Sequence, residues 1–338
     1  MGLKSPMFYI LCLLLITTLL LTRHPFTYER RVKLVGDCDL VVLFTVWRRP
    51  EMLAVQLKML RAQSILGRMK KTCVQIFQNG NHVDVNRVVK EWSSQEVWVP
   101  HYVHVVFIHS SVETGYFGRF IVPLTAHVSD DAYFVVTDDD LLWGPRYLEN
   151  MLRVVDDGYL ATRNGRFVNS DGLELMLTQI DSLWARDIHV TFNKDADYDF
   201  GGHTWSGKIQ WLRDAWTHPP DSYVNCEDFW ISAVLKTYYG IRTRSPRCPH
   251  LRPEMCSCSH DSAHTHRKAI LGNNTALNEN ENHHIIMRSI IKKYGYVTLL
   301  DEEPDIVKKT SSLYTKRVGK YNTSNSDLAV FKNCLFWV

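Results

Sequence analysis

The sequence has no glycine-rich phosphate-binding loop, no internal repeat and no low-complexity tract. The missing Walker loop argues against a phosphotransferase. An excess of one charge is also missing, because 39 Lys and Arg face 36 Asp and Glu, for a formal net charge of +3. No basic stripe interleaves with aromatic residues, so we expect no nucleic-acid partner. The 338 residues are 45% hydrophobic and 22% charged, which indicates a globular chain of one large domain or two modest ones.

An apolar segment near the N-terminus is the longest hydrophobic run. Residues 6–22 are uncharged and rich in leucine, and their length is at the lower end of the roughly 17–25 residues that cross a bilayer. A cleaved signal peptide is the alternative. Leu19, Leu20 and Leu21 make a poor cleavage site, so we favour an uncleaved signal-anchor. Basic residues flank the segment on both sides and do not fix its orientation.

Together with the cysteines and sequons described below, this anchor predicts a single-pass type II protein of the Golgi or endoplasmic reticulum membrane, with the lipid bilayer as a partner and the main domain in the lumen. The predicted order is a cytoplasmic tail at 1–5, the anchor at 6–22, a stem at 23–37, the main domain at 38–310 and a C-terminal tail at 311–338.

Cysteines and glycosylation sequons support the luminal placement. Seven of the eight cysteines follow the anchor, and sequons begin at Asn273 and Asn322. Together they favour an oxidising compartment and some disulfides. A zinc site is the alternative near residue 250, but its irregular Cys-x-Cys spacing does not match the usual zinc motifs. That alternative uses Cys248, Cys256 and Cys258 with His250 or His260.

Strand and helix patterns alternate after Cys38. Apolar and β-branched runs predict strands over 39–46, 73–77, 103–108 and 132–137, and helical spacing predicts helices over 50–64, 120–127, 229–235 and 282–296. This order predicts an α/β fold with a mostly parallel central sheet and helices on both faces. Residues between 150 and 225 show no regular pattern.

An acidic triplet, Asp138-Asp139-Asp140, follows the predicted strand 132–137. Three carboxylates repel one another, and no Lys or Arg stands beside them in the sequence. A hard divalent cation such as Mn²⁺ or Mg²⁺ would stabilise the triplet and share it with a substrate diphosphate. The alternatives are a helix cap and a solvated acidic turn.

Other polar residues are expected at the same edge of the sheet, where strands end and ligands of such sheets bind. Arg48 and Asn79 lie at or just beyond the ends of the first two predicted strands. Gly201 and Gly202 would let the backbone approach a ligand closely. Glu227-Asp228 begins a predicted helix, where capping is the alternative explanation for an acid.

The order of these motifs resembles a metal-dependent glycosyltransferase of the GT-A fold, and most nearly the exostosin-like family of α-N-acetylhexosaminyltransferases. The triple aspartate and Asn225-Cys226-Glu227-Asp228 carry most of this resemblance. Weaker matches are Val46-Trp47-Arg48, Gln78-Asn79-Gly80, Phe117-Gly118-Arg119-Phe120, Phe200-Gly201-Gly202-His203 and His284-Ile285-Ile286-Met287-Arg288.

The resemblance implies a UDP-sugar donor, a glycan or glycoprotein acceptor and a Mn²⁺ or Mg²⁺ cofactor. It implies metal binding by Asp140 with Asp138, and a disulfide from Cys226 to Cys248 or a nearby cysteine. Catalysis would fall to Asp228 and Glu227. The implied nucleotide-sugar ligands are Arg48, Asn79, Arg119, Asp138, Asp139, Gly201 and Gly202.

Three functions are compatible with these residues. The first is transfer of an N-acetylhexosamine with retention of configuration, where Asp228 positions donor or acceptor. The second is an inverting hexosyltransferase on the same fold, where Asp228 deprotonates the acceptor. The third is a catalytically silent luminal partner that binds glycans. The intact acidic triplet and intact Glu227-Asp228 argue against the third.

Overall fold

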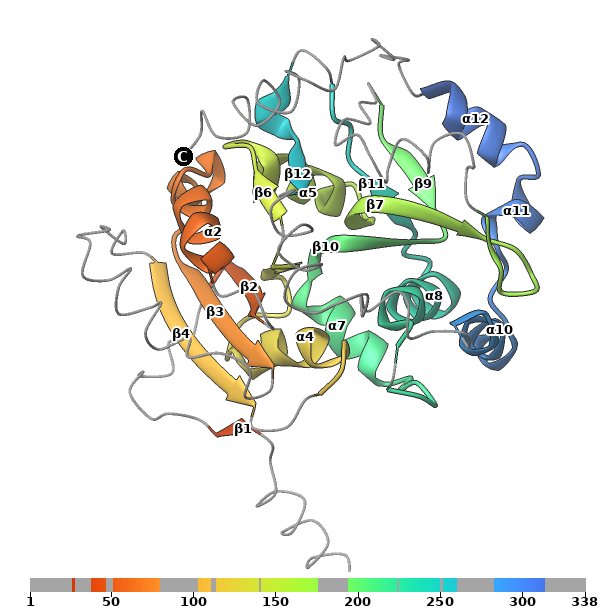
Figure 1. Cartoon of the computed structure of the whole chain (residues 1–338), viewed down its shortest axis with the longest axis horizontal. Coiled ribbons are helices and arrows are strands. Elements are labelled where there is room, and N and C mark those ends of the chain that lie inside the picture. Colours follow the sequence, from red (N-terminus) through yellow and green to blue (C-terminus); the bar gives the residue numbers. More distant parts are fainter. Residues whose placement is uncertain are drawn as a thin grey trace, which may run out of the picture.

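The computed structural model describes residues 26–27, 38–46, 51–79, 103–110, 114–139, 141–175, 194–223, 225–249, 252–259 and 283–313 (Figure 1). Its strands are β1 (Phe26–Thr27), β2 (Leu40–Val46), β3 (Thr72–Asn79), β4 (Val103–Ser110), β5 (Tyr133–Thr137), β6 (Leu141–Trp143), β7 (Leu160–Val168), β8 (Glu174–Leu175), β9 (Ala196–Tyr198), β10 (Phe200–Lys208), β11 (Thr243–Ser245) and β12 (Ser257–Ser259). Its α-helices are α2 (Glu51–Arg61), α4 (Gly118–Ile121), α5 (Tyr147–Asp156), α7 (Ile209–Trp216), α8 (Glu227–Tyr239), α10 (His283–Tyr294), α11 (Leu299–Glu302) and α12 (Ile306–Leu313).

The central sheet joins a parallel part to a mainly antiparallel part. Its order is β1-β4-β3-β2-β5-β10-β7-β11-β9, with β8 paired to β7. Strands β4, β3, β2 and β5 are mutually parallel. Strand β10 then runs antiparallel to both β5 and β7. The mixed α/β architecture expected from the sequence is therefore confirmed, and the carboxyl ends of β2 to β5 lie along one edge.

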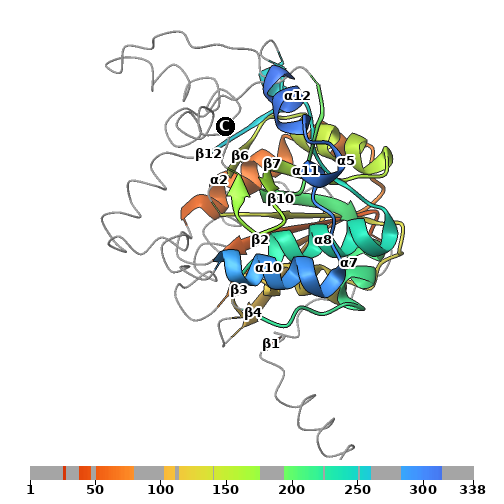
Figure 2. The ribbon, with the colours of Figure 1, turned by 90° about the vertical axis from the view of Figure 1, so that its right-hand side faces the viewer.

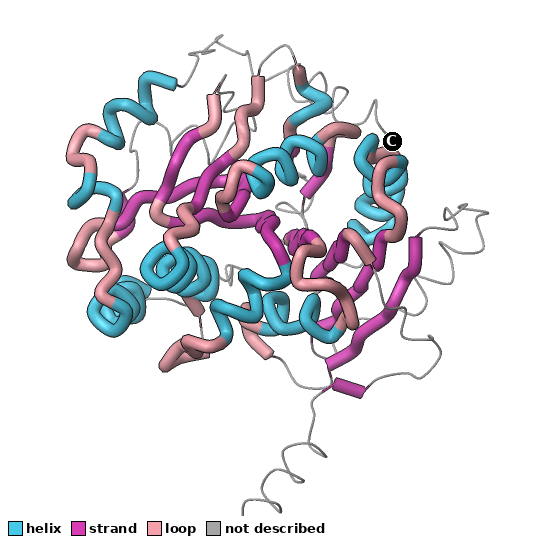
Figure 3. The backbone as a smooth tube through the Cα atoms, turned by 180° about the vertical axis from the view of Figure 1, so that it is seen from behind, coloured by secondary structure: helices cyan, strands magenta, loops and turns pink. Residues whose placement is uncertain are grey.

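Alternating side chains of the parallel strands build a separate core on each face of the sheet. Val41 and Leu43 face the core formed with α4, α7, α8 and α10. Leu40, Val42 and Phe44 face the core formed with α2 and α5. Because successive side chains of a strand point to opposite faces, strands buried on both sides read as continuous apolar runs. Figure 2 shows the sheet between these two helical layers, and Figure 3 shows α8 and α10 side by side.

Two disulfides link cysteines within the described residues. Cys38, just before β2, bonds Cys73 of β3, and Cys248 bonds Cys256. The second bond corrects the prediction that Cys226 pairs with Cys248, and it also removes the zinc alternative. Cys226 lies instead buried at the start of α8, with its Sγ 3.6 Å from the carbonyl oxygen of His283.

The predicted elements are largely confirmed, with two differences. The helix expected over 120–127 is α4 followed by a 3₁₀ turn, Val122–Thr125. Pro123 in that turn has no N–H to continue an α-helix. The region after 150 contains β7, β9, β10, α7 and β11, which the sequence pattern did not reveal.

The predicted signal-anchor at 6–22, most of the stem and the C-terminal tail beyond Leu313 lie outside the described residues. Within the described part of the chain, no helix combines the length and the apolar composition needed to cross a bilayer.

Candidate functional site

The candidate site centres on Arg119, which lies in the short helix α4. Its Nη1 is 2.5 Å from Oδ1 of Asp138, the residue that follows β5. Its Nη2 bonds the carboxylate of Glu227, the first residue of α8. One guanidinium thus joins the predicted nucleotide-binding segment to the predicted catalytic segment, 19 and 108 residues away along the chain.

This ion cluster is buried. Arg119 is 9% exposed and Glu227 is 5% exposed. Burial opposes the positive charge of Arg119, but the carboxylates of Glu227 and Asp138 raise its pKa above the ordinary value. The guanidinium also lies over the indole of Trp205, with its Cζ 4.5 Å from the ring centroid. A buried arginine with two charge-assisted bonds and an aromatic ring beneath it is held in one orientation.

Asp138 is fixed by its backbone as well as by its carboxylate. Its N–H donates to the carbonyl of His203 at 2.9 Å, and its own carbonyl accepts from Nε2 of Gln56 at 2.7 Å. Its second carboxylate oxygen, Oδ2, is 3.4 Å from Nδ1 of His203. Contacts from α2, α4 and β10 therefore converge on the first residue of the acidic triplet.

Asn79 ends β3 and holds the segment that leads to Arg119. Its Oδ1 accepts from the backbone N–H of Thr114 at 2.8 Å, and its Nδ2 donates to the carbonyl of Gly115 at 2.9 Å. Gly118 follows, and a Cβ there would lie 2.0 Å from the Thr114 hydroxyl oxygen. The loop, the glycine and Asn79 together set the position of α4. The contact of Asn79 with a nucleotide stays a prediction.

The remaining acidic residues lie at the same two segments. Asp139 is 7% exposed. Asp228, half-buried beside Glu227, accepts the backbone N–H of Phe229 through Oδ1 at 2.8 Å. The N-cap of α8 is Cys226, whose side chain makes no capping hydrogen bond, and Asp228 lies one residue inside the helix. Asp140 and Arg48 fall outside the described residues.

A hard cation suits the donor atoms of the triplet, because Mn²⁺ and Mg²⁺ favour carboxylate oxygens. Within the described residues no group of three or more His, Cys, Asp or Glu side chains is placed to hold a metal ion. Asp138 and Asp139 would contribute oxygens together with Asp140. No Lys or Arg neighbours the triplet in the sequence, but the fold brings Arg119 to one oxygen of Asp138.

Strand β10 carries the two predicted glycines beside this cluster. A Cβ added to Gly202 would meet no atom of the described residues within 4 Å. The protein's own packing therefore does not require a glycine there, and the open space suits a ligand that approaches the backbone. The indole N–H of Trp205 donates to the carbonyl of Gly201 at 2.9 Å, which ties the glycines to the ring beneath Arg119.

Two non-glycine residues of the described chain have positive φ, and both adjoin the cluster. His203 has φ 67° and bonds Asp138, while Cys226 has φ 65° and precedes Glu227. Such conformations are costly for residues with a side chain and concentrate at functional sites. The structure thus brings Arg119, Asp138 and Glu227 together. The roles of Gln56 and His203 were not predicted, because their contacts with Asp138 arise from tertiary packing.

Neither a family model nor a curated protein matches the sequence. Among solved structures, the chain is similar to the mannosyltransferase PcManGT from Pyrobaculum calidifontis in complex with GDP-Man and Mn²⁺. The identity is 10% and the TM-score 0.41, over 96% of this chain and 90% of that one.

The chain is also similar to S. aureus TarS 1-349, with 11% identity and a TM-score of 0.41 over 62% of this chain and 60% of that one. For the same protein in complex with UDP-GlcNAc the identity is 12% and the TM-score 0.40, over 62% and 56%. The chain therefore spans less than two thirds of these TarS structures. Likenesses this weak assign no activity to it, and membership of the exostosin-like family stays a prediction.

Proposed function

We propose that this protein is a metal-dependent glycosyltransferase of the GT-A fold. It transfers a sugar from a UDP-sugar to a glycan or glycoprotein acceptor. The resemblance of its motifs to the exostosin-like family favours an N-acetylhexosamine as that sugar. The observation that carries the proposal is the bridge from Asp138 through Arg119 to Glu227. Buried charges assembled from distant segments and flanked by left-handed residues are typical of reacting sites.

The bond to be broken joins a sugar to a diphosphate, so negative charge develops on the leaving group. When bound, Mn²⁺ or Mg²⁺ would supply Lewis-acid stabilisation of that charge, held by Asp140 with Asp138. Arg119 keeps Asp138 and Glu227 at a fixed separation, and the open side of Gly202 admits the donor. Arg48 and Asn79 would contact the nucleotide.

Asp228 and Glu227 carry the chemistry at the sugar. Glu227 is buried and bonded to Arg119, which suits a carboxylate that stabilises charge rather than one that exchanges protons. Asp228 is half-buried and is the better candidate to meet an acceptor hydroxyl or the donor sugar. In an inverting reaction it would remove the acceptor proton, and in the retaining reaction that we favour it positions the substrates.

We also propose a Golgi or endoplasmic reticulum location, with residues 6–22 as a type II signal-anchor. The disulfides Cys38–Cys73 and Cys248–Cys256 support an oxidising compartment. In that compartment a catalytically silent glycan-binding partner protein is the rival function.

A screen of UDP-sugars tests the proposal on the full chain. We expect Mn²⁺-stimulated hydrolysis of at least one donor, loss of the stimulation in Asp140→Ala, and a fall of about 100-fold in Asp228→Ala with UDP binding retained. Asp157→Ala, which removes an exposed carboxylate directly after α5, is the matched control and should behave as wild type.

Equal hydrolysis by wild type and Asp140→Ala would remove the metal assignment. A wild-type chain that binds no UDP with Mn²⁺ would remove the donor assignment and leave the rival function.

A further inference from the structure

Strand β10 contains one extra residue beside the candidate site. Gly202 pairs with Asn164 of β7, and Trp205 pairs with Thr162. The register thus advances three residues on β10 and two on β7, which defines a β-bulge. Bulges next to active sites commonly re-aim a side chain. The residue re-aimed here is His203, whose φ is 67°.

His203 adopts the left-handed conformation although the preceding residue, Gly202, is a glycine. Gly202 does not have a positive φ, and no atom of the described part of the chain lies within 4 Å of a Cβ built on it. A glycine at position 203 would adopt φ 67° without steric cost. The bulge alone therefore does not account for a histidine at this position, and its side chain needs another explanation.

The imidazole of His203 faces Asp138. Its Nδ1 is buried and lies 3.4 Å from Oδ2 of Asp138, whereas the side chain as a whole is 34% exposed. The exposed part is therefore the opposite edge of the ring. The carbonyl of His203 accepts the N–H of Asp138 at 2.9 Å, so the same residue bonds the backbone of Asp138 and places its ring 3.4 Å from the carboxylate.

The other carboxylate oxygen of Asp138, Oδ1, contacts Nη1 of Arg119. The carboxylate is thus confined between a guanidinium from α4 and an imidazole from β10. The same bulge places Trp205 under the guanidinium. Removing the imidazole would leave Oδ2 of Asp138 without this neighbour while the contact with Arg119 remained.

We propose that His203 is a positioning residue that aligns the carboxylate of Asp138 for the nucleotide-sugar donor, and that the strained bulge exists to hold it there. The proposal rests on the proposed function, because Asp138 is the donor-binding residue of that reaction. If the strained backbone at His203 serves to position its ring, removing the side chain should relieve the strain and stabilise the fold. The same change should weaken binding of the nucleotide-sugar donor.

The test compares His203→Gly with His203→Asn in the full chain. The readouts are the melting temperature and the affinity for UDP in the presence of Mn²⁺. We expect His203→Gly to melt about 2 °C higher, because glycine adopts the left-handed conformation without strain, and to bind UDP at least about 10-fold more weakly. His203→Asn should recover most of the affinity, since asparagine tolerates positive φ and its amide can donate to Asp138.

Gly240→Ala is the matched control for strain alone. Gly240 has φ 70°, and no atom of the described residues lies within 4 Å of a Cβ built on it. Alanine at this position should lower the melting temperature by about as much as His203→Gly raises it, and should leave UDP binding unchanged. Wild-type UDP affinity in His203→Gly, or a lower melting temperature, would overturn the role of His203. Absence of UDP binding in the wild-type chain would instead overturn the proposed function.

Discussion

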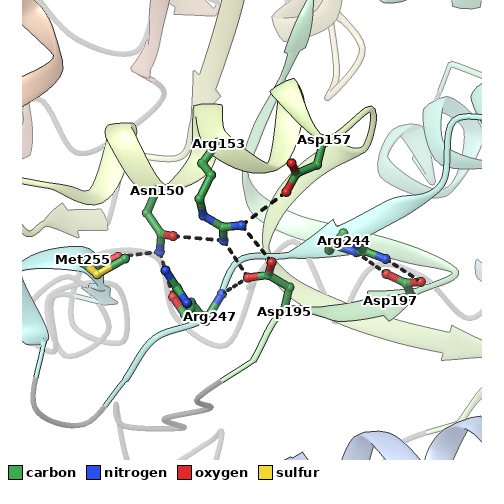
Figure 4. A network of polar contacts seen from close by, with 8 residues as sticks. All are labelled: Asn150, Arg153, Asp157, Asp195, Asp197, Arg244, Arg247 and Met255. Carbon is green, nitrogen blue, oxygen red and sulfur yellow. Dashed lines mark hydrogen bonds and ion pairs between the residues drawn. The ribbon is translucent and has the colours of Figure 1, made fainter.

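Two arginines of this protein each bind two carboxylates, yet their surroundings differ. Arg119 joins Asp138 and Glu227. Arg153, on α5, joins Asp157 at 3.3 Å and Asp195 at 2.6 Å, and its neighbour Asn150 bonds the backbone of Arg247 and Met255 (Figure 4).

The second cluster fastens the edge strands β9 and β11 to helix α5. The backbone N–H of Arg247 donates to Asp195 at 2.7 Å, and nearby Arg244 pairs with Asp197. The side chain of Arg153 is 34% exposed, against 10% for Arg119. No left-handed non-glycine residue of the described chain adjoins Arg153, whereas two flank the first cluster. Ion pairing is therefore common to the two clusters, whereas burial and adjoining backbone strain distinguish the Arg119 cluster from the Arg153 cluster.

The largest expected effect comes from Arg119→Ala. The change leaves Asp138 and Glu227 close together without their shared cation, so unfolding should become easier by about 3–5 kcal/mol. Urea denaturation measures the loss, and UDP binding should disappear with it. If Arg119→Ala lowered the free energy of unfolding by no more than the loss of an exposed ion pair does, the inferred energetic difference between the two clusters would be wrong.

Arg153→Ala should have a much smaller effect. Its carboxylate partners are half-exposed or exposed and water can replace the guanidinium, so we expect a loss of about 1 kcal/mol or less. The same urea titration measures it. UDP-sugar hydrolysis should stay at the wild-type rate, and a fall in hydrolysis would show that this cluster also shapes the site.

The smallest effect, and one that depends on pH, is expected at Glu149, which also lies on α5. A hydrogen bond from Arg146, aided by one from Ser64, lowers the pKa of Glu149 from 4.5 to about 2. Its stabilisation is therefore complete above pH 4.5 and is lost as the pH falls toward 2. Solvent screening keeps it to roughly 0.5 kcal/mol.

Denaturation of wild type and Glu149→Gln at several pH values measures this term. The two proteins should differ at pH 6 and converge near pH 2. A difference that stays constant over this range would mean that the charge of Glu149 does not contribute.

Local pattern predicted much of the fold. The apolar run before Asp138 is strand β5, and the helical spacing after Glu227 is α8. The bulged antiparallel strand β10 was not predicted, because its glycines and polar residues lack a clear two-residue period. Predictions for Asp140 and Arg48 fall outside the described residues.

The site was predicted as a set of residues but not as an arrangement. Asp138, Glu227 and Arg119 were all chosen from motifs, yet the bridge between them depends on how α4, β5 and α8 pack. Gly201-Gly202 were expected to let the backbone approach a ligand closely, but a left-handed backbone at the next residue, His203, was not predicted. Sequence shows which residues can adopt positive φ easily, but not which residue the surrounding contacts force into it.

The span of the bridge has a consequence for synthesis of the protein. Glu227 lies 108 residues after Arg119, so a ribosome must add the whole intervening chain before the cluster can close. Until then the Arg119 guanidinium can pair with Asp138 but not with Glu227. Contacts between residues so far apart in the chain form late and slowly in folding. A nascent or truncated chain that ends before α8 would therefore contain the strands of the parallel sheet but would lack the bridge from Asp138 through Arg119 to Glu227.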